Sequence, residues 1–317
     1  MRPPAFWQKG GWQAEVLEPI GALVGFLARR RQTRARPFDP GVPVICIGNL
    51  TVGGQGKTPV VLDLARRLLA KGRKPAILSR GYKGRLSGLR VDPSLHGAGD
   101  VGDEPLLLAA AAPTYIDPDR AASAKRAVAE GADCLLMDDG FQNPGLKKHL
   151  SFIVIDGPSG FGNGYVMPAG PLRENPRDGL QRADAVVLIG EDRLGLKDRL
   201  AAVRPVLLAK LMPGALDPLG PLVAFAGIGR PEKFFDSLRE LNVPLAATVP
   251  FDDHHPYSAA DWAQLQALAK QQGARLITTA KDAVRLTPEQ RAEVLVLPVA
   301  IGWQDPDALT ALIEGVL

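Results

Sequence analysis

The stretch GNLTVGGQGKTP at residues 48–59 constrains the fold more than any other part of the chain. A β-branched run at 43–50 precedes it, and residues 58–72 follow with apolar side chains at helical spacing and a terminal glycine. Glycines let successive backbone N–H groups converge on an anion, and a helix that begins directly afterwards points its free N–H groups at the same anion. The order of strand, glycine-rich turn, Lys-Thr and helix therefore predicts a phosphate-binding loop.

The loop departs from the usual phosphate-loop pattern at one position, because Thr51 stands where the first glycine is expected. An ordinary strand-to-helix turn is the alternative, although such a turn rarely needs three glycines and a lysine. On the phosphate-loop interpretation, Lys57 reaches the β- and γ-phosphates and the Thr58 hydroxyl holds Mg²⁺. The expected nucleotide-binding residues of the loop are Thr51, Val52, Gly53, Gly54, Gln55, Gly56, Lys57 and Thr58.

Strands and helices alternate along the rest of the chain. With 317 residues, 46% of them hydrophobic, the chain can build two α/β domains of ordinary size. Near-continuous apolar strands with helical segments between them predict an α/β fold with a doubly wound parallel sheet. The expected strands lie at 75–81, 113–117, 133–139, 150–157 and 183–190, and the expected helices at about 104–112 and 120–131. Residues 212–221 are rich in Pro and Gly and predict a linker between a phosphate-loop domain at 37–212 and a smaller α/β domain at 213–317.

Carboxylates follow the apolar run at 134–137, where Asp138 and Asp139 emerge at the carboxyl end of a predicted strand. An aspartate in this position of a phosphate-loop enzyme binds Mg²⁺, whereas two aspartates before a glycine could also form a plain turn. Because the phosphate loop is expected at the same edge of the sheet, the metal interpretation is favoured.

Two further polar segments, VGDEP at 101–105 and FDDHHPYS at 251–258, have several interpretations. Asp103 begins a predicted helix, so capping is its simplest role, but a carboxylate there could also take a proton from an acceptor hydroxyl. The segment at 251–258 fits no standard zinc spacing and could be an acid–base pair or a polar loop.

The N-terminal arm at 1–36 carries the excess positive charge. It holds seven basic and two acidic residues, a net of +5, so the remainder carries −1. Its apolar stretch at 16–28 is too short to span a bilayer, which needs about 20 apolar residues. An amphipathic helix on an anionic membrane, with Trp7, Trp12 and Phe26 among the headgroups, is one interpretation, and a helix packed on the protein with a solvated basic tail is the other. Nucleic-acid binding is not expected, since no aromatic platform accompanies the arginines.

Both cysteines, Cys46 and Cys134, fall in apolar runs without metal-ligand spacing and predict buried thiols of a cytosolic protein.

Eight segments occur in the order seen in tetraacyldisaccharide 4′-kinases, the lipid A kinases of Gram-negative bacteria, and from about residue 40 to 290 the chain resembles that family. The segments are GNLTVGGQGKTP (48–59), SRGYKG (79–84), VGDEP (101–105), DDGFQN (138–143), GNGYVMPAGPLRE (162–174), FAGIGRPEKFF (225–235), DDHH (252–255) and KDAVR (281–285). The family's loop also lacks the first glycine. The resemblance implies transfer of the γ-phosphate of ATP to the 4′-hydroxyl of tetraacyldisaccharide 1-phosphate.

Residue roles follow from the resemblance. It implies that Asp103 is the base, that His254 pairs with it across an interdomain cleft, and that Lys57 serves catalysis. It also implies that Thr58, Asp138 and Asp139 serve the metal and that Arg173 and Glu174 lie near the phosphates. Ala280 and Asn175 depart from the family's usual Glu and Pro.

The expected partners are the lipid substrate and the membrane surface, with no nucleic acid and no obligatory protein partner. The expected location is peripheral, on the cytoplasmic face of the bacterial inner membrane. A phosphate-loop GTPase or metallochaperone is the alternative function. Guanine selection usually needs Asn/Thr-Lys-x-Asp, however, and TAKD at 279–282 has an alanine between Thr and Lys.

Overall fold

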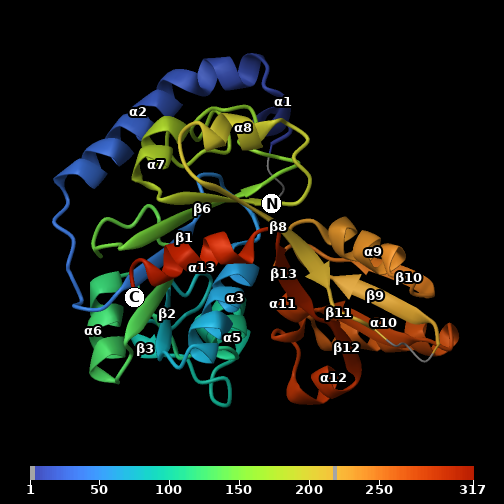
Figure 1. Cartoon of the computed structure of the whole chain (residues 1–317). Coiled ribbons are helices and arrows are strands. Elements are labelled where there is room, and N and C mark those ends of the chain that lie inside the picture. Colours follow the sequence, from blue (N-terminus) through green and yellow to red (C-terminus); the bar gives the residue numbers. More distant parts are fainter. Residues whose placement is uncertain (1–3, 217–219) are drawn as a thin grey trace.

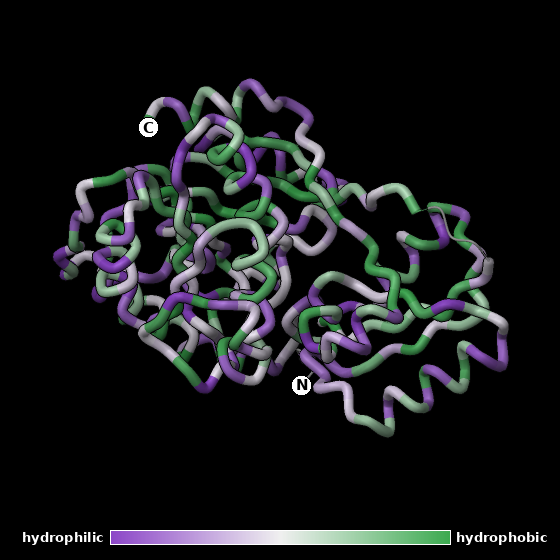
Figure 2. The backbone as a smooth tube through the Cα atoms, turned by 90° about the horizontal axis from the view of Figure 1, so that it is seen from below, coloured by the Kyte–Doolittle hydropathy of each residue, from purple (hydrophilic) through white to green (hydrophobic). Residues whose placement is uncertain are grey.

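The computed structural model describes residues 4–216 and 220–317, so Arg2 of the basic arm and residues 217–219 of the expected linker lie outside the described part. The chain forms two lobes, each built on its own sheet (Figure 1). Seen from below, hydrophobic segments run through both lobes, and the C-terminus lies on the larger one (Figure 2).

The larger lobe contains a nine-stranded sheet with the order β13-β8-β7-β6-β1-β5-β2-β4-β3. Neighbouring strands from β8 to β4 pair in parallel, and the two edge strands pair antiparallel. This confirms the predicted α/β class with a large parallel sheet. The strands are β1 (Val44–Gly48), β2 (Pro75–Ser79), β3 (Leu89–Arg90), β4 (Thr114–Ile116), β5 (Cys134–Asp138), β6 (Leu150–Asp156), β7 (Ala185–Ile189), β8 (Val206–Pro213) and β13 (Val299–Trp303).

The central strands of this sheet are buried on both sides, because helices cover both of its faces. One core cluster joins α3, α5 and α13 to the sheet, and the other joins α6, α7 and α8. Both cysteines are buried and unbridged within these cores. The helices of this lobe are α3 (Lys57–Ala70), α4 (Ala98–Val101), α5 (Asp103–Ala109), α6 (Arg120–Ala129), α7 (Pro176–Arg182), α8 (Leu196–Ala201) and α13 (Pro306–Glu314).

The smaller lobe contains a four-stranded parallel sheet with the order β10-β9-β11-β12. Phe234, Phe235 and Leu238 of α9 pack on one face, and Trp262 and Leu265 of α10 pack on the other. Its elements are β9 (Leu222–Ala226), α9 (Pro231–Glu240), β10 (Leu245–Pro250), α10 (Ala259–Gln271), β11 (Arg275–Thr279), α11 (Ala280–Ala283), α12 (Pro288–Ala292) and β12 (Val294–Leu297).

The end of the chain departs from the expected division at residue 212. Strand β13 pairs antiparallel with β8, with Ile301 opposite Leu211, and therefore belongs to the larger sheet. Helix α13 buries Leu309 and Ile313 in the same core as α3, and the two helices lie side by side in Figure 1. Sheet pairing thus returns residues 299–317 to the larger lobe, because an antiparallel edge strand carries its apolar helix back onto that lobe.

The N-terminal arm forms α1 (Phe6–Lys9) and α2 (Trp12–Arg34). Small residues bring α2 close to the body, since a Cβ added at Gly21 would lie 2.5 Å from the Val166 carbonyl oxygen. Trp7 is tied to the body, where its indole N–H donates to the Pro168 carbonyl at 3.0 Å, and so it differs from the expectation that it faces headgroups. Among the described residues, no helix is long and apolar enough to cross a membrane.

The opposite face of α2 is apolar and exposed. Trp12 and Phe26 are 70% and 58% exposed, and they share this face with Val16, Ile20, Leu23 and Leu27. Small residues therefore pack the helix on the protein, as one interpretation expected, while its large apolar residues point away from the body; membrane contact of this face stays a prediction.

Candidate active site

The glycine-rich loop runs from the carboxyl end of β1 to α3, which begins at Lys57. Gly53 and Gly56 have φ of +112° and +84°, and a Cβ at Gly56 would approach Ile189 Cδ1 to 2.8 Å, so these positions require glycine. Gln55 attaches the loop to the end of β6, because its Oε1 accepts the Asp156 backbone N–H at 2.7 Å. The predicted order of strand, turn and helix is present.

Lys57 lies between the loop and the paired carboxylates. Its ammonium donates to Asn49 Oδ1 at 3.2 Å and lies 3.5 Å from Asp139 Oδ1. The two segments meet because β1 and β5 are parallel neighbours, with Ile47 opposite Asp138. Asn49 was not predicted as a site residue, and its position inside the loop motif was the available signal.

Asp138 is almost completely buried, and its Oδ1 has no hydrogen-bond partner among the described residues. Burial, with the negative charges of Glu104 and Asp139, raises the pKa of Asp138 to about 7. A buried carboxylate oxygen without a partner fits a cation ligand, so the Mg²⁺ expectation fits the residues present. No group of three or more His, Cys, Asp or Glu in the described ranges is arranged to hold a metal by itself.

Asp139 forms a two-pronged ion pair with Arg173. The guanidinium donates to the two carboxylate oxygens at 2.8 and 3.1 Å. Burial opposes ionisation of Asp139, but Lys57 and Arg173 outweigh it and hold its pKa below the usual value. With φ of +49°, Asp139 turns the chain sharply after β5. The structure thus brings Lys57, Asp139 and Arg173 together at the carboxyl edge of the sheet.

Glu174 contacts other partners than the neighbouring Arg173 does. It is 4% exposed, one oxygen accepts the Gln142 amide at 3.0 Å, and the other pairs with Arg182. Both oxygens are therefore engaged by the protein, which favours a supporting role for Glu174 over phosphate contact. Asn175, where the family usually has Pro, caps α7 by accepting the Arg177 N–H at 2.9 Å.

Asp103 and His254 meet across the two lobes. His254 Nδ1 lies 2.7 Å from Asp103 Oδ2, and both side chains are mostly buried. Burial would raise the pKa of Asp103, but the hydrogen bond from His254 and the nearby charges of Lys281 and Arg285 lower it. Asp103 starts α5, and His254 sits in a loop with φ of +63°. A pair contributed by segments 151 residues apart forms only when the lobes lie together.

Arg285 supports this pair and was not predicted as a site residue. It is buried, and its Nε lies 3.6 Å from Asp103 Oδ2. Its other nitrogens donate to the carbonyls of His255 and Gly227 at 3.1 and 3.0 Å and to Asp282 at 2.8 Å. The His254 backbone N–H also donates to Gly227, so Arg285 fixes the loop that carries the histidine. KDAVR was the available signal, since a basic residue within a family segment needs a partner.

Asp282 of TAKD is bound by other groups of the protein. It is fully buried and accepts from Tyr257 at 2.6 Å and from the Gly227 N–H at 2.8 Å. A guanine-selecting aspartate must be free to bind the base, so the geometry does not favour the GTPase alternative. Ala280 begins the short helix α11 behind its cap, Thr279.

A second contact between the lobes involves Asp156 at the carboxyl end of β6. Lys233 Nζ lies 2.8 Å and Arg230 Nη2 lies 3.1 Å from its two oxygens, and both cations come from the start of α9. Since the Asp156 N–H also holds Gln55, this ion cluster connects the smaller lobe to the phosphate loop.

Comparison with known proteins finds a family that matches most of the chain. The model of the tetraacyldisaccharide-1-P 4′-kinase family matches residues 13–317. The chain belongs to that family. The resemblance inferred from the eight segments is confirmed.

Relatives described as tetraacyldisaccharide 4′-kinase cover nearly the whole chain. One from Gluconacetobacter diazotrophicus is 53% identical over 99% of this chain and 98% of its own length. Another, from Rhodospirillum centenum, is 51% identical over 100% and 97%. A crystal structure described as the "apo" form of LpxK from Aquifex aeolicus in complex with ATP has a TM-score of 0.78. It is 27% identical and covers 96% of this chain and 99% of that one. The kinase family and the fold therefore agree over most of the chain.

Proposed function

We propose that this chain transfers the γ-phosphate of ATP to the 4′-hydroxyl of tetraacyldisaccharide 1-phosphate. The observation that carries the proposal is the Asp103–His254 pair, which the two lobes assemble beside Glu104. The charge of Glu104 also contributes to the raised pKa of Asp138, which supports a single site for the pair and for the carboxylate that we propose as a metal ligand. The activity by which the family and its members are known supplies the acceptor and the position of transfer.

In this proposal Asp103 accepts the proton of the acceptor hydroxyl. Its lowered pKa keeps the carboxylate ionised near neutral pH, so the 2.7 Å contact requires a proton on His254 Nδ1. His254 thereby orients the base, as the orienting group does in other catalytic pairs. Arg285 holds the loop beneath the histidine and keeps positive charge near the carboxylate.

Lys57, Arg173 and the loop N–H groups would bind the transferring phosphate. Lys57 now contacts Asp139, and a nucleotide would offer the ammonium additional negative partners. Thr58 and Asp138 would hold Mg²⁺, with Asp139 beside them. When bound, Mg²⁺ would neutralise charge on the phosphate oxygens.

We also propose peripheral binding to the cytoplasmic face of the inner membrane. The exposed face of α2 carries Trp12, Ile20 and Phe26, and the helical repeat places Arg30 and Arg34 on the same side. Apolar side chains would enter the headgroup region while the arginines bind lipid phosphates. ATP in the cytoplasm and two buried free thiols support that face.

The direct test is consumption of ATP by the purified protein with and without the lipid acceptor. The proposal expects ATP turnover that depends on the acceptor and that is lost in Asp103→Ala. Equal turnover without the lipid, or a strong preference for GTP, would instead indicate a nucleotide hydrolase.

A further inference from the structure

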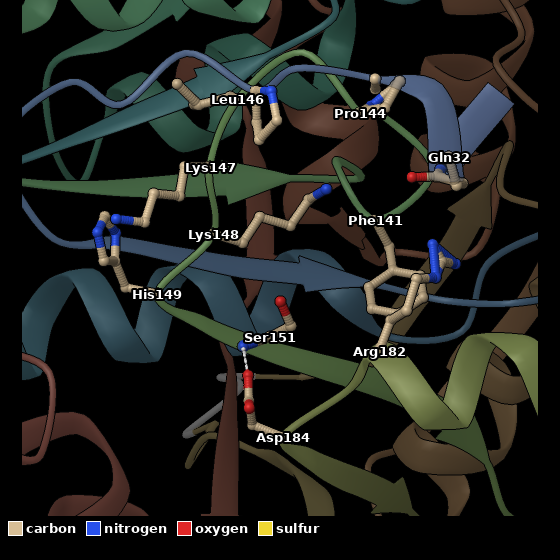
Figure 3. Close-up of a pocket in the computed structure, with 12 residues that line it drawn as sticks. Gln32, Phe141, Pro144, Leu146, Lys147, Lys148, His149, Ser151, Arg182 and Asp184 are labelled. Carbon is tan, nitrogen blue, oxygen red and sulfur yellow. Dashed lines mark hydrogen bonds between the residues drawn. The ribbon is translucent and has the colours of Figure 1, made fainter.

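A cationic cavity of about 340 Å³ lies where the N-terminal arm joins the body (Figure 3). Gln32 at the end of α2 and the following residues Ala35 and Pro37 form part of its wall. Lys148 and Arg182 contribute positive charge to the lining. The arm is fixed here, since the Gln32 amide donates to the Gln142 carbonyl at 2.9 Å.

One wall of this cavity lies at the edge of the sheet opposite the phosphate loop. His149 and Ser151 of its lining lie at the amino end of β6, and Asp184 lies just before β7. The phosphate loop and Asp138 lie at the carboxyl ends of the neighbouring strands. Since β6 spans seven residues, at ~3.3 Å per residue the two edges are about 20 Å apart. The side of the cavity formed by His149, Ser151 and Asp184 is therefore remote from the phosphate loop, whereas Phe141 on its other side stands two residues after Asp139.

Lys148 is the charged group of the cavity that lacks a carboxylate partner. Its ammonium donates to the Asn143 carbonyl at 2.5 Å, and within the described ranges no carboxylate forms an ion pair with it. Burial and the nearby Arg182 lower the pKa of Lys148 despite the charge of Glu174. A partly buried ammonium in this position is stabilised by an added anion.

The two other cations that line the cavity, Lys147 and Arg182, already have carboxylate partners, whereas among the described residues the Asp184 carboxylate has only hydrogen-bond donors. Lys147 pairs with Asp39 at 2.7 Å, and Arg182 pairs with Glu174 and stacks over the Phe141 ring. The Asp184 carboxylate accepts the Ser151 backbone N–H at 2.7 Å. His149 adds a neutral donor, because its Nδ1 accepts the Val44 N–H and leaves its Nε2 to carry the proton. The lining thus contains an ammonium without a carboxylate partner, a hydroxyl and an imidazole, each of which can donate to a phosphate oxygen.

We propose that this cavity binds the phosphate of an anionic phospholipid headgroup, with Lys148 as its main ligand. The inference rests on the peripheral membrane binding proposed above and extends it to one site. A lipid is favoured over free phosphate because the cavity wall is the continuation of α2. That helix exposes its apolar face and then Arg30, Arg31 and Arg34, so a surface-bound arm would bring headgroups to the cavity mouth.

The test compares sedimentation of the full-length protein with vesicles of phosphatidylcholine alone and of phosphatidylcholine with phosphatidylglycerol. Lys148→Gln should bind the phosphatidylglycerol vesicles about tenfold more weakly than the unchanged protein, since one charge-assisted contact is lost. Binding to phosphatidylcholine alone should not change. Lys148→Arg should restore the preference, and this variant separates loss of charge from damage to the fold.

Lys270→Gln is the matched control, because it removes the same charge from α10 of the smaller lobe. If Lys148→Gln binds phosphatidylglycerol vesicles as the unchanged protein does, or no more weakly than Lys270→Gln, the headgroup site is wrong while arm binding can stand. Should the unchanged protein bind neither vesicle, the membrane proposal fails, and titration with soluble glycerol phosphate decides the cavity. If the unchanged protein binds glycerol phosphate and Lys148→Gln does not, the phosphate site is supported. If the unchanged protein binds no glycerol phosphate, the phosphate site is overturned. Equal binding of inorganic phosphate would overturn the lipid assignment.

Discussion

Replacing Asp156 by asparagine should loosen the contact between the lobes while leaving the phosphate loop intact. The substitution removes the charge that holds Lys233 and Arg230 at 2.8 and 3.1 Å. It keeps the backbone N–H that donates to Gln55, so the loop retains its support. Because His254 reaches Asp103 only when the lobes lie together, we expect a loss of turnover with little change in nucleotide affinity.

The magnitude follows from the exposure of the partners. The Arg230 and Lys233 side chains are 46% and 51% exposed, so solvent screens each pair and each contributes about 0.5–1 kcal/mol. Loss of both should shift the ratio of closed to open molecules by about 5- to 30-fold. Turnover should then fall by at most that full factor, and by less the more the closed form dominates in the unchanged protein.

Steady-state kinetics and small-angle scattering would measure the two effects. Asp236→Asn is a matched control. It also removes one negative charge, but Asp236 lies on α9 and pairs with Arg239 of the same helix, so no contact between the lobes is lost. Unchanged turnover and an unchanged radius of gyration in Asp156→Asn would refute the reasoning. A loss confined to nucleotide affinity would show that Asp156 acts only through Gln55.

Four further outcomes are expected. Lys57→Ala should lower turnover by about 10²-fold or more, because the ammonium stabilises the transferring phosphate, and near-normal steady-state rates would contradict the loop assignment. Asp103→Ala and His254→Ala should each lower turnover by about 10²- to 10⁴-fold, with the double variant barely worse than the worse single variant; multiplicative losses in the same assay would show independent action. Asp138→Asn should be more stable than the unchanged protein at pH 8 in thermal melts with a chelator, because folding raises the pKa of Asp138 to about 7 and the buried charge is costly above that pH. The difference in melting temperature should shrink as the pH falls from about 7 to about 4. A difference that stays constant over this range would exclude the raised pKa. Deleting residues 1–36 should weaken vesicle sedimentation and leave ATP binding intact, whereas undiminished sedimentation would place membrane contact elsewhere.

Local patterns predicted the parts of the site that lie in one stretch of chain. The loop at 51–58 and the carboxylates at 138 and 139 are dictated by glycines, a helix start and an apolar strand, all read within a few residues. Their meeting follows from the pairing of parallel neighbours β1 and β5. Sequence reasoning was sufficient here because each requirement is local.

Contacts between distant segments were beyond such reasoning. The Asp103–His254 pair came only from the family resemblance, and KDAVR marked a basic residue without indicating the partners of Arg285, which lie up to 58 positions away. The Asp156–Arg230 contact joins residues 74 positions apart in different lobes. Strand β13 was missed for a related reason, since an edge strand that pairs antiparallel leaves no local mark of the sheet it joins.

The two faces of α2 show a limit of another kind. A long helix with a basic end was predictable, but the side that packs on the body was not, because glycine and alanine carry little hydrophobic signal. Gly21 and Ala14 face the protein, and the larger apolar residues face away. Burial was therefore opposite to what side-chain hydrophobicity alone indicates.

The position of the transferred phosphate tests the central proposal most directly. The purified protein should be incubated with ATP, Mg²⁺ and tetraacyldisaccharide 1-phosphate, and the lipid product should be examined by ³¹P–¹H correlation spectroscopy. The proposal predicts a new phosphomonoester coupled to the proton at the 4′ carbon, absent with Asp103→Ala. A new phosphate at any other position, or consumption of ATP without a phosphorylated lipid, would contradict it.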